Sequence, residues 1–136
     1  IRVARLIEQR RKLASRYQEN ALLNPLLIAT SSVDDRFLKG VRTNIENHLD
    51  DESFGVVELG DAMGMSRSQL HRKLKALTGF SPNELIRNIR LEHGKALLEK
   101  GAGNASEVAF MVGFSSLSYF SKCFSDYFGY PPSKVD

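Results

Sequence analysis

The chain has 136 residues, of which 42% are hydrophobic and 26% are charged, and its formal net charge at pH 7 is +3. This length suffices for one domain with an additional arm, and the hydrophobic fraction can supply a packed core, which excludes wholesale disorder. The sequence has no run of eighteen apolar residues, which excludes a membrane-spanning helix, and its single cysteine, Cys123, excludes an internal disulfide and a multi-cysteine zinc finger.

Residues 1–20 are predicted to form a helical arm, because they contain no Gly or Pro and carry apolar residues near heptad spacing. The apolar stripe consists of Val3, Leu6, Leu13 and Tyr17. Because the chain begins at Ile1 rather than Met and shows no secretory leader, we expect a cytoplasmic fragment of a longer protein.

A polar linker containing Pro25 is expected at 24–32, followed by a helix capped by Asp34 or Asp35. Apolar residues recur every four positions in this helix, which is typical of a helix with one buried face. They are Phe37, Val41, Ile45 and Leu49. The acidic segment 50–53 is expected to end the helix.

From residue 53 onward, capping boxes and glycines mark the helix boundaries. Helices are predicted at about 57–63, 67–77, 82–100, 105–112 and 116–128. The capping boxes pair Ser66 with Gln69, Ser81 with Glu84 and Asn104 with Glu107, and the helices stop at Gly64, Gly79, Gly101, Gly113 and Gly129. No strand is expected, so the predicted fold class is all-α.

A short helix, a glycine turn and a longer helix occur twice in succession. Residues 58–64 match 107–113 at an offset of 49, whereas residues 70–74 match 120–124 at an offset of 50. The motif Gly-aromatic-x-Pro at 79–82 recurs at the larger offset, so the turn in the second copy is one residue longer. Three matches in order predict a duplicated helix-turn-helix unit, whose second helix enters the major groove of DNA.

The glycine permits the chain reversal in each unit, and apolar residues are expected to hold its two helices together. These packing residues are Leu59, Met63, Leu70 and Leu74 in the first copy and Val108, Val112, Phe120 and Phe124 in the second. The outward-facing residues are predicted to contact DNA. They are Arg67, Ser68, Gln69, His71, Arg72 and Lys75 in the first copy and Ser116, Leu117, Ser118, Ser121 and Lys122 in the second.

The helix at about 82–100 connects the two helix-turn-helix subdomains. Its ~19 residues span ~28 Å at ~1.5 Å per residue. Successive major grooves on one face of DNA are ~34 Å apart, so a rigid helix of this length can hold the two units in consecutive grooves.

Four stretches carry a resemblance to a known family. They are MSRSQLHRKL at 65–74, TGFSP at 78–82, VGF at 112–114 followed by SYFSK at 118–122, and FGYPPS at 128–133. Together they resemble the AraC/XylS family of transcription regulators over residues 38–136. The resemblance implies a double helix-turn-helix DNA-binding domain at 34–136. Its first unit lies at about 56–79, its connecting helix at about 82–100 and its second unit at about 105–129.

The first unit and the segment 24–37 also resemble the output domain of hybrid two-component regulators. This resemblance implies that residues 1–33 end a receiver-like domain and its linker, and that the protein controls carbohydrate-utilisation genes. The expected partners are double-stranded promoter or operator DNA, RNA polymerase and, in the full-length protein, a second copy paired through residues 1–20. This fragment is expected to make no membrane contact, although it could be the cytosolic end of a membrane-anchored sensor.

The resemblance places the base-reading positions at Ser68, His71 and Arg72 and at Leu117, Ser118, Ser121 and Lys122. We predict that Arg72 contacts a guanine, with a phosphate contact or salt bridge as the alternative. His71 is left open between a base edge and solvent, and Arg67 and Lys75 are expected on phosphates. Because the second helix offers mostly small hydroxyls, one Leu and one Lys, the first unit is expected to give most of the base specificity and the second mainly phosphate and weak contacts.

Several other side chains are expected to be structural. Ser66 and Ser115 are predicted to be helix caps, whose adjacent amides could bind phosphate. Cys123 is expected to be a small packed side chain rather than a redox sensor. Helical spacing favours a core position for the aromatic residues Phe110, Phe114, Tyr119, Phe120, Phe124 and Phe128.

We expect no catalysis, no cofactor and no metal site. His48, His71 and His93 lie on separate predicted helices without partners at ligand spacing, and no phosphate loop or catalytic motif occurs. The alternative to DNA binding is a helical dimerisation or interaction module whose basic surfaces meet an acidic protein. The salt dependence of binding to duplex DNA distinguishes the two.

Overall fold

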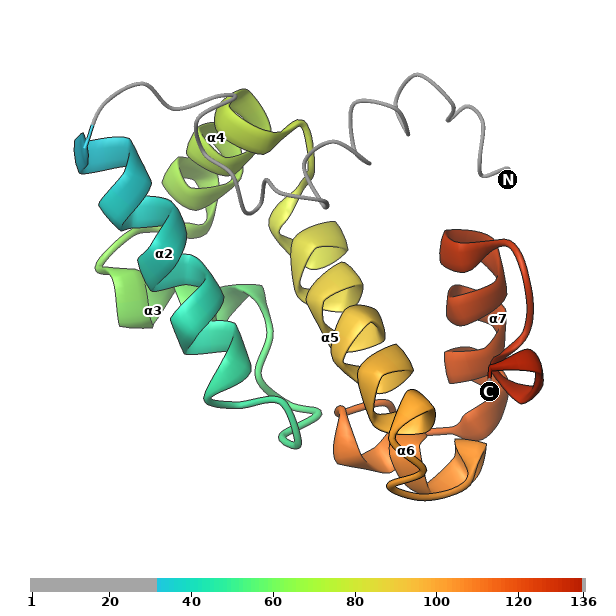
Figure 1. Cartoon of the computed structure of the whole chain (residues 1–136). Coiled ribbons are helices and arrows are strands. Elements are labelled where there is room, and N and C mark those ends of the chain that lie inside the picture. Colours follow the sequence, from blue (N-terminus) through green and yellow to red (C-terminus); the bar gives the residue numbers. More distant parts are fainter. Residues whose placement is uncertain (1–31, 136) are drawn as a thin grey trace.

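The computed structural model describes residues 32–135, whose regular structure is entirely helical (Figure 1). The elements are α2 (Ser32–Glu46), α3 (Val56–Met63), α4 (Arg67–Thr78), α5 (Pro82–Glu99), α6 (Ala105–Met111), α7 (Leu117–Phe128) and a short 3₁₀ turn, η3 (Pro132–Lys134). The predicted all-α class is confirmed. The predicted arm at 1–20 lies outside the described residues.

The long helix α5 is the central element and divides two hydrophobic cores (Figure 1). It contacts α2 and α4 of the first unit and α6 and α7 of the second. The first core contains Leu38, Val41, Ile45, Phe54, Leu59, Leu70, Leu74, Leu85, Ile86 and Ile89, and the second contains Leu91, Val108, Ala109, Val112, Phe114, Phe120, Cys123 and Phe124. Each unit therefore has its own core, and α5 contributes side chains to both.

The helix starts follow the predicted capping boxes. The Ser66 hydroxyl accepts the backbone N–H of Gln69 at 3.2 Å, and Gln69 Oε1 accepts the backbone N–H of Ser66 at 2.9 Å. The same reciprocal pair joins Ser81 to Glu84 at the start of α5. Because each cap satisfies N–H groups that have no partner inside the helix, it fixes where the helix begins.

Helix α2 differs from its prediction at both ends. Asp34 and Asp35 lie in its first turn instead of capping it, because the helix already includes Ser32. The helix ends at Glu46, and turns replace the predicted last helical residues up to Leu49. The reason is tertiary: the Leu49 carbonyl turns toward α5, where it accepts a hydrogen bond from a buried arginine.

The buried stripe of α2 is also shifted by one position at its start. Leu38, Val41 and Ile45 are buried, whereas Phe37 is half-buried at the edge of the same core. Lys73 of α4 lies 4.7 Å from the centroid of the Phe37 ring. The first helix of the described chain is thus packed against the first helix-turn-helix unit and belongs to it structurally.

Candidate nucleic-acid interface

The predicted DNA-contacting residues of the first unit are all exposed on α4. Leu70, Leu74 and Thr78 are the buried residues of this helix and turn its other side toward the core. The exposed residues that were predicted to contact DNA are Arg67, Ser68, Gln69, His71, Arg72 and Lys75. Gln69 also has a structural role, because its side-chain oxygen accepts the backbone N–H of the N-cap residue Ser66.

Three cations on α4 are free of carboxylates. Among the described residues, Arg67, Arg72 and Lys75 have no ion-pair partner within 4.0 Å. Lys73, which was not predicted to contact DNA, differs from them because it pairs with Asp34 of α2 at 3.8 Å. Within residues 32–135, α4 therefore presents positive charge that no acid within 4.0 Å compensates, as a phosphate-binding surface requires.

The second unit presents a less charged surface on α7. Leu117, Ser118 and Lys122 are exposed, but Ser121 is half-buried. The Lys122 ammonium lies 3.2 Å from a carboxylate oxygen of Asp126, and both side chains are largely exposed. This arrangement agrees with the expectation that the second unit gives the weaker contacts, which stays a prediction.

The predicted cap at Ser115 is wrong by one residue. Ser116 is the N-cap of α7, and its hydroxyl accepts the backbone N–H of Tyr119 at 3.2 Å. The longer second turn explains the shift, because an offset of 50 from Ser66 leads to Ser116. Ser116, predicted to contact DNA, thus uses its hydroxyl oxygen inside the protein.

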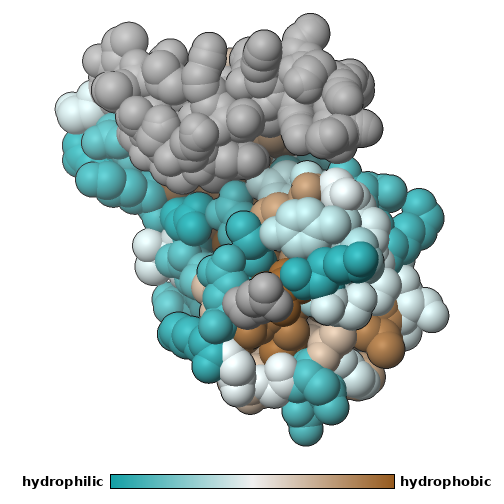
Figure 2. Space-filling model, turned by 45° about the vertical axis from the view of Figure 1, so that its right-hand side comes forward, coloured by the Kyte–Doolittle hydropathy of each residue, from teal (hydrophilic) through white to brown (hydrophobic). Residues whose placement is uncertain are grey.

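Two of the six aromatic residues predicted in the core are exposed. Phe114, Phe120 and Phe124 are buried, and Phe128 is half-buried against the second core, but Phe110 is 55% exposed and Tyr119 is 48% exposed. Phe110 is two residues after the buried Val108, which places it about 200° around α6 and away from the core. On the face drawn in Figure 2, hydrophobic surface appears as separate patches among hydrophilic residues.

Arg90 of α5 is a structural residue that the sequence analysis did not identify. Its side chain is buried and donates to four backbone carbonyls. Nη1 lies 2.6 Å from Leu49 O and 2.9 Å from Val112 O, and Nη2 lies 3.0 Å from Asp51 O and 3.2 Å from Phe54 O. Burial lowers the pKa of this guanidinium, and the negative charges of Asp51 and Asp50 oppose that shift.

These acceptors belong to both units. Leu49 and Phe54 lie between α2 and α3, whereas Val112 is the C-cap of α6. One guanidinium therefore joins the first unit, the connecting helix and the turn of the second unit. Such an arrangement fixes how the two units are oriented relative to each other, since breaking it would leave buried acceptors unpaired.

Gly113, at the turn of the second unit, is required for two reasons. Its φ is +87°, a left-handed conformation that side chains rarely adopt. In addition, a Cβ atom at this position would overlap Arg90 Nη1 and the carbonyl oxygen of Leu49. Gly64, the equivalent residue of the first unit, has φ +70° and open space around it. Both glycines thus allow the chain to turn, as predicted, but only at Gly113 would an added side chain collide with neighbouring atoms.

A second set of contacts between the two units is a cluster of polar side chains around Glu92 and His93 of α5. Arg42 of α2 donates to Glu46 at 3.0 Å and lies 3.6 Å from Glu92, which accepts the Tyr127 hydroxyl of α7 at 3.0 Å. His93 Nε2 lies 2.9 Å from Glu46. Burial raises the pKa of the Glu92 carboxyl, while the charge of Arg42 and the Tyr127 hydroxyl lower it.

Cys123 packs in the second core, as predicted. Burial raises the pKa of its thiol, and a hydrogen bond with Tyr119 and the positive charge of Arg87 oppose this shift.

Residues 32–135 contain no group of three His, Cys, Asp or Glu side chains arranged to hold a metal ion. Each helix in this part of the chain is too short or too polar to cross a membrane.

Comparison with known proteins gives similarities in sequence and in fold. A family model described as a helix-turn-helix domain matches residues 59–136. The chain is 37% identical over 134 residues to histidine kinase P4 of Formosa agariphila, a match covering 98% of this chain and 10% of the kinase. It is 34% identical over 84 residues to the HTH-type transcriptional regulator MtrA of Neisseria gonorrhoeae, covering 62% of this chain and 28% of MtrA. The chain thus spans a minor part of either relative.

Two solved structures have the same arrangement of helices. One is a transcriptional regulator of Chromobacterium violaceum described as containing an AraC-type DNA-binding domain. It has a TM-score of 0.70 and 23% identity, and the match covers 77% of this chain and 93% of that one. The other is the C-terminal domain of AraT, a response regulator from Geobacillus stearothermophilus, with a TM-score of 0.67, 25% identity and coverage of 79% and 85%.

Proposed function

This chain belongs to the AraC/XylS family of helix-turn-helix DNA-binding transcription regulators, and from that premise we propose that it is the output domain of a two-component system. Similarity to a histidine kinase and to the C-terminal domain of a response regulator supports this proposal. The domain acts as a binding module rather than as an enzyme. It reads promoter DNA after an upstream receiver domain has been phosphorylated.

Phosphorylation acts through pairing of subunits in this proposal. When two copies pair, binding of one domain to DNA raises the effective concentration of the second at a neighbouring site. Residues 1–20 are the proposed pairing segment, and RNA polymerase is the proposed downstream partner. The controlled genes are proposed to serve carbohydrate utilisation, a proposal supported by the resemblance to hybrid sensors of this type.

The observation that carries the DNA-binding proposal is the three exposed cations of α4 that have no ion-pair partner among the described residues. Arg67, at its first turn, and Arg72 and Lys75 further along are exposed on the helix that a helix-turn-helix unit inserts into the major groove. A second unit of the same layout lies at the other end of α5. This arrangement suits a periodic, negatively charged ligand.

Selection from random DNA duplexes tests the proposal. We expect enrichment of sites with two short sequence boxes, about 10 base pairs apart from centre to centre. Binding to the selected site should weaken linearly on a double-logarithmic plot as salt is raised, with a slope of about −0.9 for each phosphate contacted. Failure to enrich any sequence, with salt-insensitive binding, would contradict sequence-specific DNA binding.

A further inference from the structure

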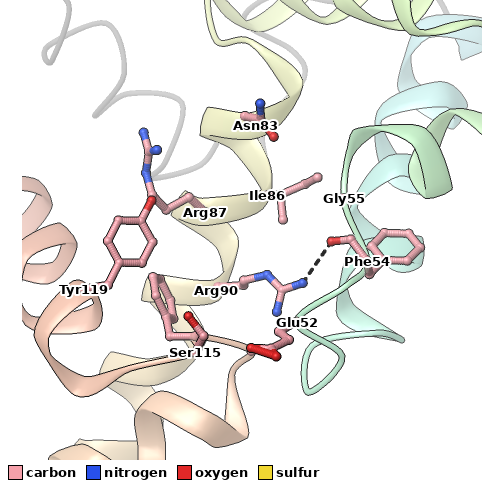
Figure 3. A pocket seen from close by; sticks show the side chains of 11 residues that line it. Glu52, Phe54, Gly55, Asn83, Ile86, Arg87, Arg90, Ser115 and Tyr119 are labelled. Carbon is pink, nitrogen blue, oxygen red and sulfur yellow. Dashed lines mark hydrogen bonds between the residues drawn. The ribbon is translucent and has the colours of Figure 1, made fainter.

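A hollow of about 480 Å³ lies beside α5, between the two units (Figure 3). Its walls come from three places in the sequence. Gly55 belongs to the entry of α3, Asn83 and Arg87 belong to α5, and Ser115 and Tyr119 belong to the turn and first residues of α7. The hollow is therefore a feature of the assembled pair of units and is absent from either unit alone.

The side chains around the hollow include several hydrogen-bond donors. Arg87 is half-buried and, within the described residues, has no ion-pair partner. Asn83, Ser115 and Tyr119 are exposed and supply an amide and two hydroxyls, of which the Tyr119 hydroxyl also contacts the Cys123 thiol. Figure 3 shows the Arg87 guanidinium pointing away from Arg90, on the same side of the hollow as the Tyr119 ring.

One acid, Glu52, is among the described lining residues. Figure 3 shows it on the Arg90 side of the hollow, away from the guanidinium of Arg87. The two charges are thus not paired across the hollow. As far as the described residues go, the positive group at the Arg87 end has no carboxylate partner and can accept an anion from outside.

The position of the hollow relative to the two units indicates which anion it meets. In a helix-turn-helix unit the first helix crosses the DNA backbone and the second enters the major groove. Gly55 is the N-cap of the first helix of the first unit, and Tyr119 lies in the first turn of the second helix of the second unit. Two consecutive major grooves on one face of a duplex are separated by a minor groove, and the sugar-phosphate backbones of the two strands border that minor groove.

We propose that Arg87, with Asn83, Ser115 and Tyr119, binds the phosphodiester backbone that borders the minor groove between the two major grooves. The guanidinium fork matches phosphate oxygens, and the amide and hydroxyls add donors to the same anion. Such a contact carries no sequence information but fixes the register of both units on the duplex. This proposal rests on the proposed function, because it presupposes that both units bind one DNA segment.

The first part of the test compares Arg87→Ala with Arg36→Ala. Arg36 is an exposed arginine of α2 outside the hollow, so its loss removes the same charge elsewhere. Affinity is measured by fluorescence anisotropy on the selected two-box duplex over a range of salt concentrations. We expect Arg87→Ala to weaken binding about tenfold and to reduce the salt slope by about one, with base preference unchanged. Arg36→Ala should change neither quantity.

The second part of the test uses the unmodified protein and changes the DNA. Methylphosphonate groups replace the charged phosphates of the intervening backbone, one at a time. We expect one or two of these replacements to weaken wild-type binding about as much as Arg87→Ala does, and to have little further effect on that variant. Tyr119→Phe, which removes only the hydroxyl, should give a smaller loss at the same phosphates.

The outcomes separate the two proposals. Wild-type binding that is indifferent to the intervening methylphosphonates would overturn the backbone site, even if Arg72→Ala still relaxed discrimination at one base pair. Wild-type protein that selects no duplex would instead contradict the proposed function. The methylphosphonate arm needs no variant, so an Arg87→Ala protein that failed to fold would not leave the site untested.

Discussion

Arg72 and Arg90 carry the same guanidinium group in opposite environments. Arg72 is exposed on α4 without a carboxylate partner among the described residues, whereas Arg90 is 5% exposed and bound to four carbonyls. A free, exposed guanidinium can exchange water for a base or a phosphate at little cost. A buried one bound to carbonyls acts as a structural residue, since removing it leaves acceptors without donors.

The first prediction concerns Arg72 and its neighbour Lys75. Arg72→Ala should lose about 1–3 kcal/mol of binding free energy and relax discrimination at one base pair, because a guanidinium recognises guanine O6 and N7 together. Lys75→Ala should weaken binding to all sequences alike. Competition binding against a panel of single-base variants of the selected site measures both effects. An equal loss across the panel for Arg72→Ala would refute its role in base recognition.

The second prediction concerns Arg90. Replacement by Met should lower the free energy of unfolding by roughly 3 kcal/mol or more, because several buried carbonyls lose their donor at about 1–3 kcal/mol each. Urea denaturation followed by circular dichroism measures this loss. Arg36→Met is the matched control on the surface of α2 and should change stability by less than about 0.5 kcal/mol. Equal stability of the two variants would show that the carbonyl contacts contribute little.

The exposed residues of α4 could be predicted from the sequence, whereas Arg90 could not. Periodicity places Leu70 and Leu74 inside and thereby assigns their neighbours to the outside. The partners of Arg90 are 22 to 41 residues away in the chain, so no local pattern indicates them. The one available signal was an arginine one position after the buried Ile89, inside the apolar part of α5.

At the scale of elements, the caps set most helix boundaries and are visible in the sequence. The capping boxes at Ser66, Ser81 and Asn104 begin α4, α5 and α6 as predicted. The predicted N-cap of α7, Ser115, is one residue before the observed one, Ser116. The sequence gives no capping box there, because the third helical residue is Tyr119 and not a Gln or Glu that could bond back to the N-cap. The end of α2 was misplaced because it depends on a contact with α5 rather than on a local signal.

The third prediction compares the two turns. Gly64→Ala should cost about 1–2 kcal/mol of stability, since it forces a side chain into the left-handed region. Gly113→Ala should cost more, because its Cβ would also displace Arg90 from its carbonyls. Thermal and urea unfolding of both variants give the comparison. Equal destabilisation would mean that the turn conformation alone determines the requirement for glycine.

The fourth prediction concerns Glu92, whose pKa in the folded protein is raised by burial above the usual 4.5. A raised carboxyl pKa means that the folded protein holds this proton more readily than the unfolded chain. The stability that results is present below pH 4.5 and is lost as the pH rises through the folded pKa. The free energy of unfolding of the wild type, measured relative to Glu92→Gln, should therefore fall as the pH rises above 4.5. A difference that rises with pH would contradict the direction of the shift.

At the scale of the whole molecule, α5 links the units through two separate sets of polar contacts, one around Arg90 and one around Glu92. Arg90 binds carbonyls from both units, and Glu92 accepts the Tyr127 hydroxyl of α7 and lies near Arg42 of α2. The sequence predicted the length of the connecting helix and the duplication of the units. It did not reveal these long-range contacts, which connect α5 to both units. We therefore expect the two units to move as one body and to meet both boxes of the DNA site together.

The most direct test of that claim is the dependence of affinity on the spacing between the two boxes. Binding is measured on the selected duplex, on the same duplex with five base pairs inserted between the boxes, and on a duplex with one box. Half a helical turn places the second box on the opposite face of the DNA, so the insertion should reduce affinity to that of the single box. Undiminished affinity for the inserted duplex would contradict a rigid pair of DNA-binding units.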